Sequence, residues 1–287
     1  MAQESVTCFG RRGTYAEVRV RSEDSFETRT RTIWTSGDFL PIARSYSTGA
    51  EQFISRLGID RGDTVLDVAC GTGNLAIPAA RTGARVFGID IAPYMIAQAR
   101  LEARAAGCKV DFDVGNAEAL PYMDGLFDTT VTMFGAMFSS RPEATATELV
   151  RVTRIGGRVA MANLTPDGFA GRYFRAQSSV LPPSPDLRNP LDWGQEEKVR
   201  ALFGDFVTSM TFARRTLALR FPMPPSAVSE LFATCYGPTV TALEALSPGD
   251  ADDLRHEISR LFHLHNVATD GTTAVPVEFL EVQARVA

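Results

Sequence analysis

Residues 65–74 read VLDVACGTGN, and this stretch decides the fold. Its apolar, partly β-branched start is typical of a short buried strand. Gly71 and Gly73 follow where the strand should end, and glycines there allow a tight backbone turn and the close approach of a ligand. A helix predicted from Asn74 presents its unpaired N–H groups behind this turn. The stretch therefore predicts a strand, a glycine loop and a helix that together bind an adenosine-like ligand.

Strands and helices are predicted in alternation on both sides of this loop. The expected strands cover residues 64–68, 85–89, 109–114, 127–133, 158–163, 207–219 and 275–286. The expected helices cover residues 39–57, 74–81, 93–106, a segment from Pro142, residues 167–180, and two or three segments within 226–265. Such alternation favours parallel strands joined by crossover helices on both faces of one sheet. The fold class is therefore α/β.

One domain preceded by an arm is the expected organisation. Residues 1–36 show no helical or strand period, which favours a mobile arm or a lid over the active site. The domain covers residues 37–287, with cap elements inserted around 165–205 and 222–265. Four prolines within residues 181–190 predict a stiff connector in the first of these elements.

Composition narrows the classes of partner. The net charge of −5 provides no positive field for phosphate backbones or anionic lipids, so neither nucleic acid nor a membrane is expected as a partner. No apolar run is long enough to span a membrane, and the start of the chain lacks the apolar core of a signal peptide. The four cysteines form no C-x-x-C pair, which predicts reduced thiols and no metal site. We expect a cytoplasmic monomer or homodimer.

Two acids flank the glycine loop. Asp90 follows Gly71 by nineteen residues, at the tip of the second strand, where a carboxylate accepts hydrogen bonds from ribose hydroxyls. Glycine spacing alone does not separate the possible ligands, because residues 71–76 also fit the G-x-G-x-x-A pattern of dinucleotide-binding enzymes. Asp67 suits a cationic amino-acid group and would repel a pyrophosphate. The charge therefore favours S-adenosylmethionine (SAM), although both acids could also simply cap neighbouring backbone.

These features resemble the class I SAM-dependent methyltransferases, in particular the branch of the ubiquinone and menaquinone biosynthesis methylases, over roughly residues 34–287. The resemblance implies that residues 67–74 hold the methionine part of SAM. It also implies that Asp90 binds the ribose and that Ile91 and Met95 pack near the adenine.

The same resemblance extends to later segments. Residues 115–121 look like the segment that reads the adenine amino group; the family commonly has Asp where this chain has Asn116, whose carbonyl oxygen still accepts an N–H bond. Residues 266–287 resemble the family's closing antiparallel strand, which implies a Rossmann-like, seven-stranded, mostly parallel sheet with a small helical cap. The implied cofactor-binding residues are Asp67, Ala69, Gly71, Gly73, Asn74, Asp90, Ile91, Met95, Asn116, Ala117 and Phe134.

An apolar pocket for the methyl acceptor is predicted at the carboxyl ends of the fourth and fifth strands. Its candidate residues are Tyr46, Met137, Phe138, Phe169 and Tyr173, although core packing would also account for several of them. Direct displacement from a sulfonium needs alignment and no protein nucleophile, so the sequence identifies no catalytic residue. The three histidines are candidate general bases only by their type: His256, His263 and His265.

The predicted activity is transfer of a methyl group from SAM to an O, N or C atom of a small-molecule metabolite. Two alternatives stay open. A SAM-binding regulatory or scaffolding module would bind the donor without turnover. A nucleotide-dependent oxidoreductase would use the same topology and glycine spacing.

Overall fold

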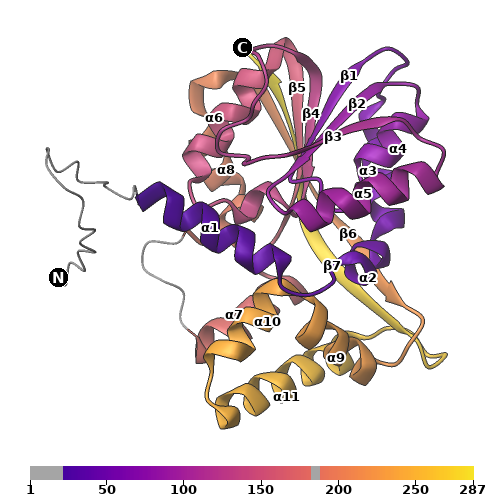
Figure 1. The fold of residues 1–287 in the computed structure, drawn as a ribbon, viewed down its shortest axis with the longest axis vertical. Helices are drawn as coiled ribbons and strands as arrows, with labels where there is room; N and C mark the ends of the chain where they lie inside the picture. Colours follow the sequence, from indigo (N-terminus) through magenta and orange to yellow (C-terminus); the bar gives the residue numbers. More distant parts are fainter. Residues whose placement is uncertain (1–21, 182–187) are drawn as a thin grey trace, which may run out of the picture.

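The computed structural model describes residues 22–181 and 188–287. Its centre is a seven-stranded sheet with the order β3-β2-β1-β4-β5-β7-β6 (Figure 1). The strands are β1 (Thr64–Val68), β2 (Arg85–Asp90), β3 (Val110–Val114), β4 (Phe127–Met133), β5 (Thr153–Leu164), β6 (Val207–Phe221) and β7 (Thr273–Val286). Strands β1 to β5 are parallel to one another, and β7 runs antiparallel to both β5 and β6. The predicted Rossmann-like sheet with its antiparallel closing strand is confirmed.

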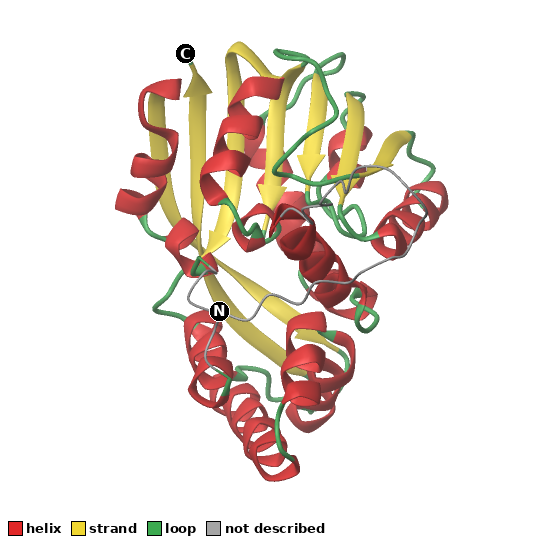
Figure 2. Ribbon diagram, turned by 60° about the vertical axis from the view of Figure 1, so that its left-hand side comes forward, coloured by secondary structure: helices red, strands yellow, loops and turns green. Residues whose placement is uncertain are grey.

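Helices cover both faces of the sheet, and Figure 2 shows both layers. One layer contains α3 (Ser47–Leu57), α4 (Ala76–Arg81) and α5 (Pro93–Ala105), and the other contains α6 (Pro142–Val152) and α8 (Glu196–Phe203). The side chains of β1 alternate between the two cores: Val65 packs with the first layer, whereas Leu66 and Val68 pack with the second. Burial on both faces explains why this strand reads as an apolar run.

A group of outer helices lies beyond the carboxyl ends of the parallel strands (Figures 1 and 2). These outer helices are α7 (Phe169–Val180), α9 (Pro225–Cys235), α10 (Gly237–Ala245) and α11 (Pro248–His265). They stand there because β6 and β7 continue as a two-stranded ribbon past Leu164, where β5 ends. Phe262 joins them: its ring centroid lies 5.1 Å from that of Phe169 and 4.9 Å from that of Phe232.

The N-terminal part departs from the sequence-based expectation in two places. A helix, α1 (Ser22–Thr35), forms where the sequence shows no helical period, and it runs between the sheet and the outer helices, in contact with α5 and α10 (Figure 1). Tertiary contacts of this kind stabilise helices that their own sequence does not specify. The rest of the predicted arm, residues 1–21, lies outside the described residues. The helix expected over residues 39–57 is interrupted at Tyr46, giving α2 (Leu40–Ser45) and α3.

Smaller differences occur later in the chain. Short 3-10 turns form at Ala136–Phe138, Pro190–Gly194 and Gly204–Phe206, and α8 was not expected. Most of the predicted proline connector falls on residues 182–187, outside the described part. Within the described residues, no helix has both the length and the apolar character that crossing a membrane requires.

Candidate active site

A pocket of about 960 Å³ opens at the carboxyl ends of β1, β2 and β4. The loops after four parallel strands and one face of α1 supply its walls, as expected for ligand sites of open α/β sheets. The predicted cofactor residues that line it are Asp67, Ala69, Gly71, Asn74, Asp90, Ile91, Met95, Asn116, Ala117 and Phe134. Gly73 is the exception, since the position of a Cβ there faces Ile77 and Phe112.

The glycine loop leaves room for a ligand beside its backbone. Gly71 has φ of 52°, and a Cβ placed on it would meet no atom within 4 Å. Its N–H donates a 2.9 Å hydrogen bond to Oδ2 of Asp90, which ties the loop after β1 to the end of β2. The backbone at Gly71 is therefore fixed from behind and open toward the pocket.

Asp67 and Asp90 are buried carboxylates that accept backbone hydrogen bonds. Oδ2 of Asp67 accepts from the N–H of Ala76 at 3.0 Å, and Oδ1 of Asp90 accepts from the N–H of Ala92 at 2.9 Å. Burial raises the pKa of Asp67 well above its usual value. Burial also raises the pKa of Asp90, although the N–H groups of Ala92 and Gly71 oppose this shift. The backbone-capping role considered from the sequence is thus present, and neither acid has a cationic side-chain partner among the described residues.

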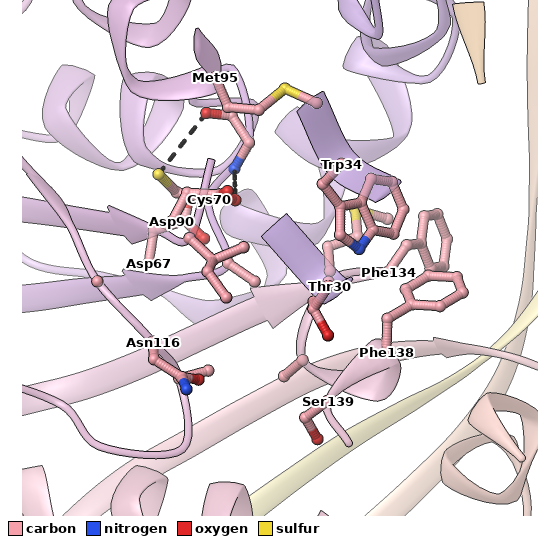
Figure 3. A pocket seen from close by; sticks show the side chains of 18 of the residues that line it. Thr30, Trp34, Asp67, Cys70, Asp90, Met95, Asn116, Phe134, Phe138 and Ser139 are labelled. Carbon is pink, nitrogen blue, oxygen red and sulfur yellow. Dashed lines mark hydrogen bonds between the residues drawn. The ribbon is translucent and has the colours of Figure 1, made fainter. Parts of the chain in front are cut away.

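The ionisable side chains that line the pocket are all acidic among the described residues. Glu27 and Glu118 also line it, and no Lys, Arg or His of the described residues does. Glu118 is paired with Arg141 at 2.8 Å, whereas the two buried aspartates have no such neutralisation. In Figure 3, Asp67 and Asp90 lie together and the rings of Trp34, Phe134 and Phe138 lie apart from them. A cationic ligand with an apolar portion fits this arrangement, and a pyrophosphate would be repelled.

Helix α1 contributes residues that the sequence does not point to. Glu27, Thr30 and Trp34 line the pocket, and Figure 3 shows Thr30 and Trp34 facing it. Nδ2 of Asn116 donates to Oε2 of Glu27 at 3.3 Å, and Oδ1 of Asn116 accepts from the N–H of Glu118 at 3.0 Å. The residue that the resemblance assigns to the adenine therefore also joins the loop after β3 to α1.

Comparison with known proteins identifies the family of this chain. A family profile for a methyltransferase domain matches residues 65–157. The chain is 38% identical over 242 residues to an uncharacterized protein of Mycobacterium tuberculosis, covering 82% of this chain and 87% of that protein. It is 41% identical over 123 residues to the demethylmenaquinone methyltransferase of Thermus thermophilus, covering 41% of this chain and 56% of that enzyme. The chain belongs to the class I SAM-dependent methyltransferases.

Solved structures share the fold of this methyltransferase at low identity. The YcgJ protein of Bacillus subtilis superposes with a TM-score of 0.57 at 18% identity, covering 83% of this chain and 98% of that one. The cyclase SpnF gives a TM-score of 0.54 at 23% identity, covering 84% of this chain and 81% of that one. Because a protein described as a cyclase has this fold, the fold by itself does not specify the acceptor or the reaction.

A second cavity of the methyltransferase, of about 610 Å³, lies between the first pocket and the outer helices. Both cavities are lined by the side chains of Trp34, Phe39, Tyr46, Phe134 and Phe138. We call the second cavity the inner chamber. It brings together four of the five predicted acceptor residues, namely Tyr46, Phe138, Phe169 and Tyr173.

The remaining candidates lie elsewhere. Met137 is buried in the core on the opposite side of the sheet and lines neither cavity. The three histidines are in or at the end of α11, and none lines either cavity. The ring of His265 packs on Phe169 at 5.5 Å, and burial together with Arg172 lowers its pKa.

Proposed function

We propose that the first pocket binds SAM and that the inner chamber holds a small-molecule methyl acceptor. The observation that carries this proposal is the pair of buried aspartates without a cationic side-chain partner, in a pocket whose other side is aromatic. SAM carries positive charge on its sulfonium and ammonium groups, so it would offset the cost of two buried carboxylates. The open backbone at Gly71 gives the room that such a ligand needs.

Each candidate residue then has a specific task. Asp90, oriented by two backbone N–H groups, would accept from the ribose hydroxyls. Asp67 would face the cationic amino-acid end, and Asn116 would accept from the adenine amino group. Phe134 and Tyr46, whose ring centroids are 5.7 Å apart, belong to the wall that the pocket and the chamber share. They would align the acceptor with the methyl group.

The chemistry needs alignment more than reactive side chains. Bound SAM would supply an activated methyl carbon to an acceptor atom that the residues of this chain orient; the sulfur would leave as a neutral thioether, and any proton on the acceptor atom would pass to water. Holding two reactants in line replaces a bimolecular encounter, and this positioning lowers the activation barrier substantially. The loops at the ends of β1, β2 and β4, which line the pocket, would provide this alignment here.

We also propose that α1 is a lid and that the outer helices form a cap. Helix α1 reaches the pocket through Glu27, Thr30 and Trp34, and it contacts α10 of the outer helices. Its opening would admit SAM, and its closure would bring Trp34 against both cavities.

Calorimetric titration with SAM, S-adenosylhomocysteine and NADH tests the cofactor assignment. We expect saturable binding of the first two ligands and none of NADH. Absence of heat with both sulfur ligands, or saturable binding of NADH, would refute it.

A screen of phenols, amines and quinones with a tritiated methyl donor tests turnover. We expect label to pass to at least one of these classes. SAM binding without any labelled product across the panel would instead support the regulatory or scaffolding alternative.

A further inference from the structure

The inner chamber has uncharged walls. No Asp, Glu, Lys, Arg or His lines it among the described residues, in contrast to the acidic first pocket. Its rings gather around Tyr236, which meets Trp34 and Tyr173 edge to face at centroid distances of 6.0 and 6.1 Å and packs in a tilted arrangement against Phe232 at 5.6 Å. Such walls favour flat, apolar molecules that can stack or make edge contacts with aromatic rings.

Among the hydrogen-bonding side chains that line the chamber, Tyr173 has a partner within the protein. The hydroxyl of Tyr173 is 2.7 Å from Oγ1 of Thr239, which also accepts from Nε2 of Gln177 at 2.7 Å. By contrast, neither the hydroxyl of Tyr236 nor the indole N–H of Trp34 has a hydrogen-bond partner among the described residues. The Tyr236 side chain is 8% exposed, and its hydroxyl is not among the fully buried, unpaired polar atoms of the described residues, so it stays accessible to solvent. An oxygen atom of a ligand in the chamber can therefore replace water as its hydrogen-bond partner.

Tyr236 is suited to donate that hydrogen bond. Burial raises the pKa of its phenol, and the neighbouring Tyr173 and Tyr46 shift it in the same direction. The hydroxyl thus keeps its proton at neutral pH and offers it to an oxygen atom of a bound molecule. The aromatic neighbours of Tyr236 fix the ring from several sides, so the hydroxyl is held in place before a ligand arrives.

We infer that the inner chamber binds an uncharged, apolar ring compound that carries a hydroxyl or carbonyl oxygen, and that Tyr236 selects it by hydrogen-bonding that oxygen. The role of this compound as the methyl acceptor rests on the proposed function. A carboxylate or an ammonium group would lose its hydration in the chamber without gaining a partner of opposite charge. Amino acids, organic acids and charged amines are therefore disfavoured.

Three probes of matched size test this selection: naphthol, naphthoate and naphthylmethylammonium, substituted at the same ring position. Binding of each is measured by calorimetry on the full chain loaded with S-adenosylhomocysteine. We expect naphthol to bind at least about tenfold more tightly than either ion. Equal binding of the three probes would overturn the inference.

Two variants test whether naphthol binds in the inner chamber. Tyr236→Phe keeps the ring and removes the hydroxyl, and we expect it to weaken naphthol binding by about threefold to tenfold, the range for one hydrogen bond. Tyr122→Phe is the matched control, since its hydroxyl bonds to Asp113 outside the chamber. Ala170→Phe places a ring in the chamber from α7 and should abolish naphthol binding.

The donor titration separates this inference from the proposed function. Each variant should keep its affinity for S-adenosylhomocysteine within about twofold of the unmodified chain, which also shows that it is folded. Unchanged naphthol affinity in Tyr236→Phe or in Ala170→Phe would overturn the inference while the donor site stands. Failure of S-adenosylhomocysteine to bind the unmodified chain would instead refute the proposed function.

Discussion

Ala69 and Phe134, which directly follow β1 and β4, both have left-handed backbone conformations, with φ of 54° and 56°. They are the two residues other than glycine with positive φ in the described part of the chain. The loops also approach closely, because a Cβ at Gly135 would lie 2.6 Å from both Cβ and the carbonyl oxygen of Ala69. Both residues line the first pocket. Backbone strain is thus concentrated where the donor is proposed to bind, a known feature of functional sites.

Replacing Ala69 with glycine should stabilise the free protein and weaken donor binding. A left-handed conformation costs an L residue about 1–2 kcal/mol, and glycine removes this cost. The greater freedom of glycine in the unfolded chain opposes the gain in stability by about 0.5–1 kcal/mol. We expect a net rise of about 1–3 °C in Tm. The looser loop should weaken SAM binding about twofold to tenfold, because less of the site is organised before binding.

Ala97→Gly is the control for this substitution. Ala97 is exposed in the middle of α5, where glycine lowers stability by about 1 kcal/mol and SAM affinity should not change. Thermal unfolding and SAM titration of both variants provide the comparison. A fall in Tm for both would show that the conformation at Ala69 carries no strain.

Asp67→Asn should raise the stability of the free protein at neutral pH and impair donor binding. Burial raises the pKa of the Asp67 side chain above the usual pKa of about 3.8. The stabilising contribution of the protonated side chain is therefore fully present at pH values below the usual pKa, and it is lost as the pH rises through the raised pKa. The asparagine oxygen can still accept from Ala76, without the cost of a buried charge. We expect Tm to rise by a few degrees at pH 7, less at pH 5, and SAM affinity to fall by at least about tenfold.

Asp128→Asn should behave in the opposite way. Hydrogen bonds from the N–H of Thr64 and from Arg154 lower the pKa of Asp128, so its contribution is present above the usual value and is lost as pH falls through the lowered one. This variant should lose stability at pH 7 and retain SAM binding, because Asp128 lies at the start of β4, outside the pocket. If both asparagine variants moved Tm in the same direction, the assignment for Asp67 would fail.

Local signals account for what the sequence predicted. The parallel strands are short apolar runs bounded by turn residues, so β1, β2 and β4 were predicted from local sequence, together with Asp67, Gly71 and Asp90 at the ends of β1 and β2. The helix predicted to end at residue 57 does end there, where Gly58 has a left-handed φ of 57°. The pattern of a buried strand and the glycines after it is contained within a few residues, and no distant contact is needed to recognise it.

Long-range contacts account for what it did not predict. Helix α1 has no clear apolar face of its own, and Trp34 becomes a pocket residue only because Phe138 and Tyr236, from distant segments, pack against it. The break at Tyr46 likewise accompanies a contact with Phe134 after β4. Tyr236 carries no local signal either, since its importance comes from the rings that the fold gathers around it.

Glu281→Gln should be costly although it lies outside both cavities. The Glu281 side chain is 4% exposed on β7, and its Oε2 accepts from Arg56 at 2.6 Å and from Arg215 at 2.8 Å. Loss of the negative charge would leave two arginines facing a neutral group. Because both arginines are partly exposed and can be rehydrated, we expect a loss of about 1–3 kcal/mol in the free energy of unfolding.

The pair between Arg81 and Glu51 provides the matched control. Its N–O distance is 2.8 Å, yet both side chains are 53% exposed, so Glu51→Gln should cost no more than about 0.5 kcal/mol. Urea unfolding of the two variants measures the difference. Similar losses would mean that burial does not decide the strength of the Glu281 cluster.

Trp34 should report donor binding and the movement of α1. The chain has two tryptophans: Trp34 lines both cavities, whereas Trp193 is 2% exposed and packs against Phe203 in the opposite core. We expect S-adenosylhomocysteine to change the fluorescence of the unmodified chain and of Trp193→Phe, and to leave that of Trp34→Phe unchanged. If α1 is a lid, the same ligand should also slow hydrogen exchange of the α1 amides by at least about tenfold. Amides of α8, on the other face of the sheet, should not respond, and equal protection of both helices would point to general stabilisation with no closing of α1.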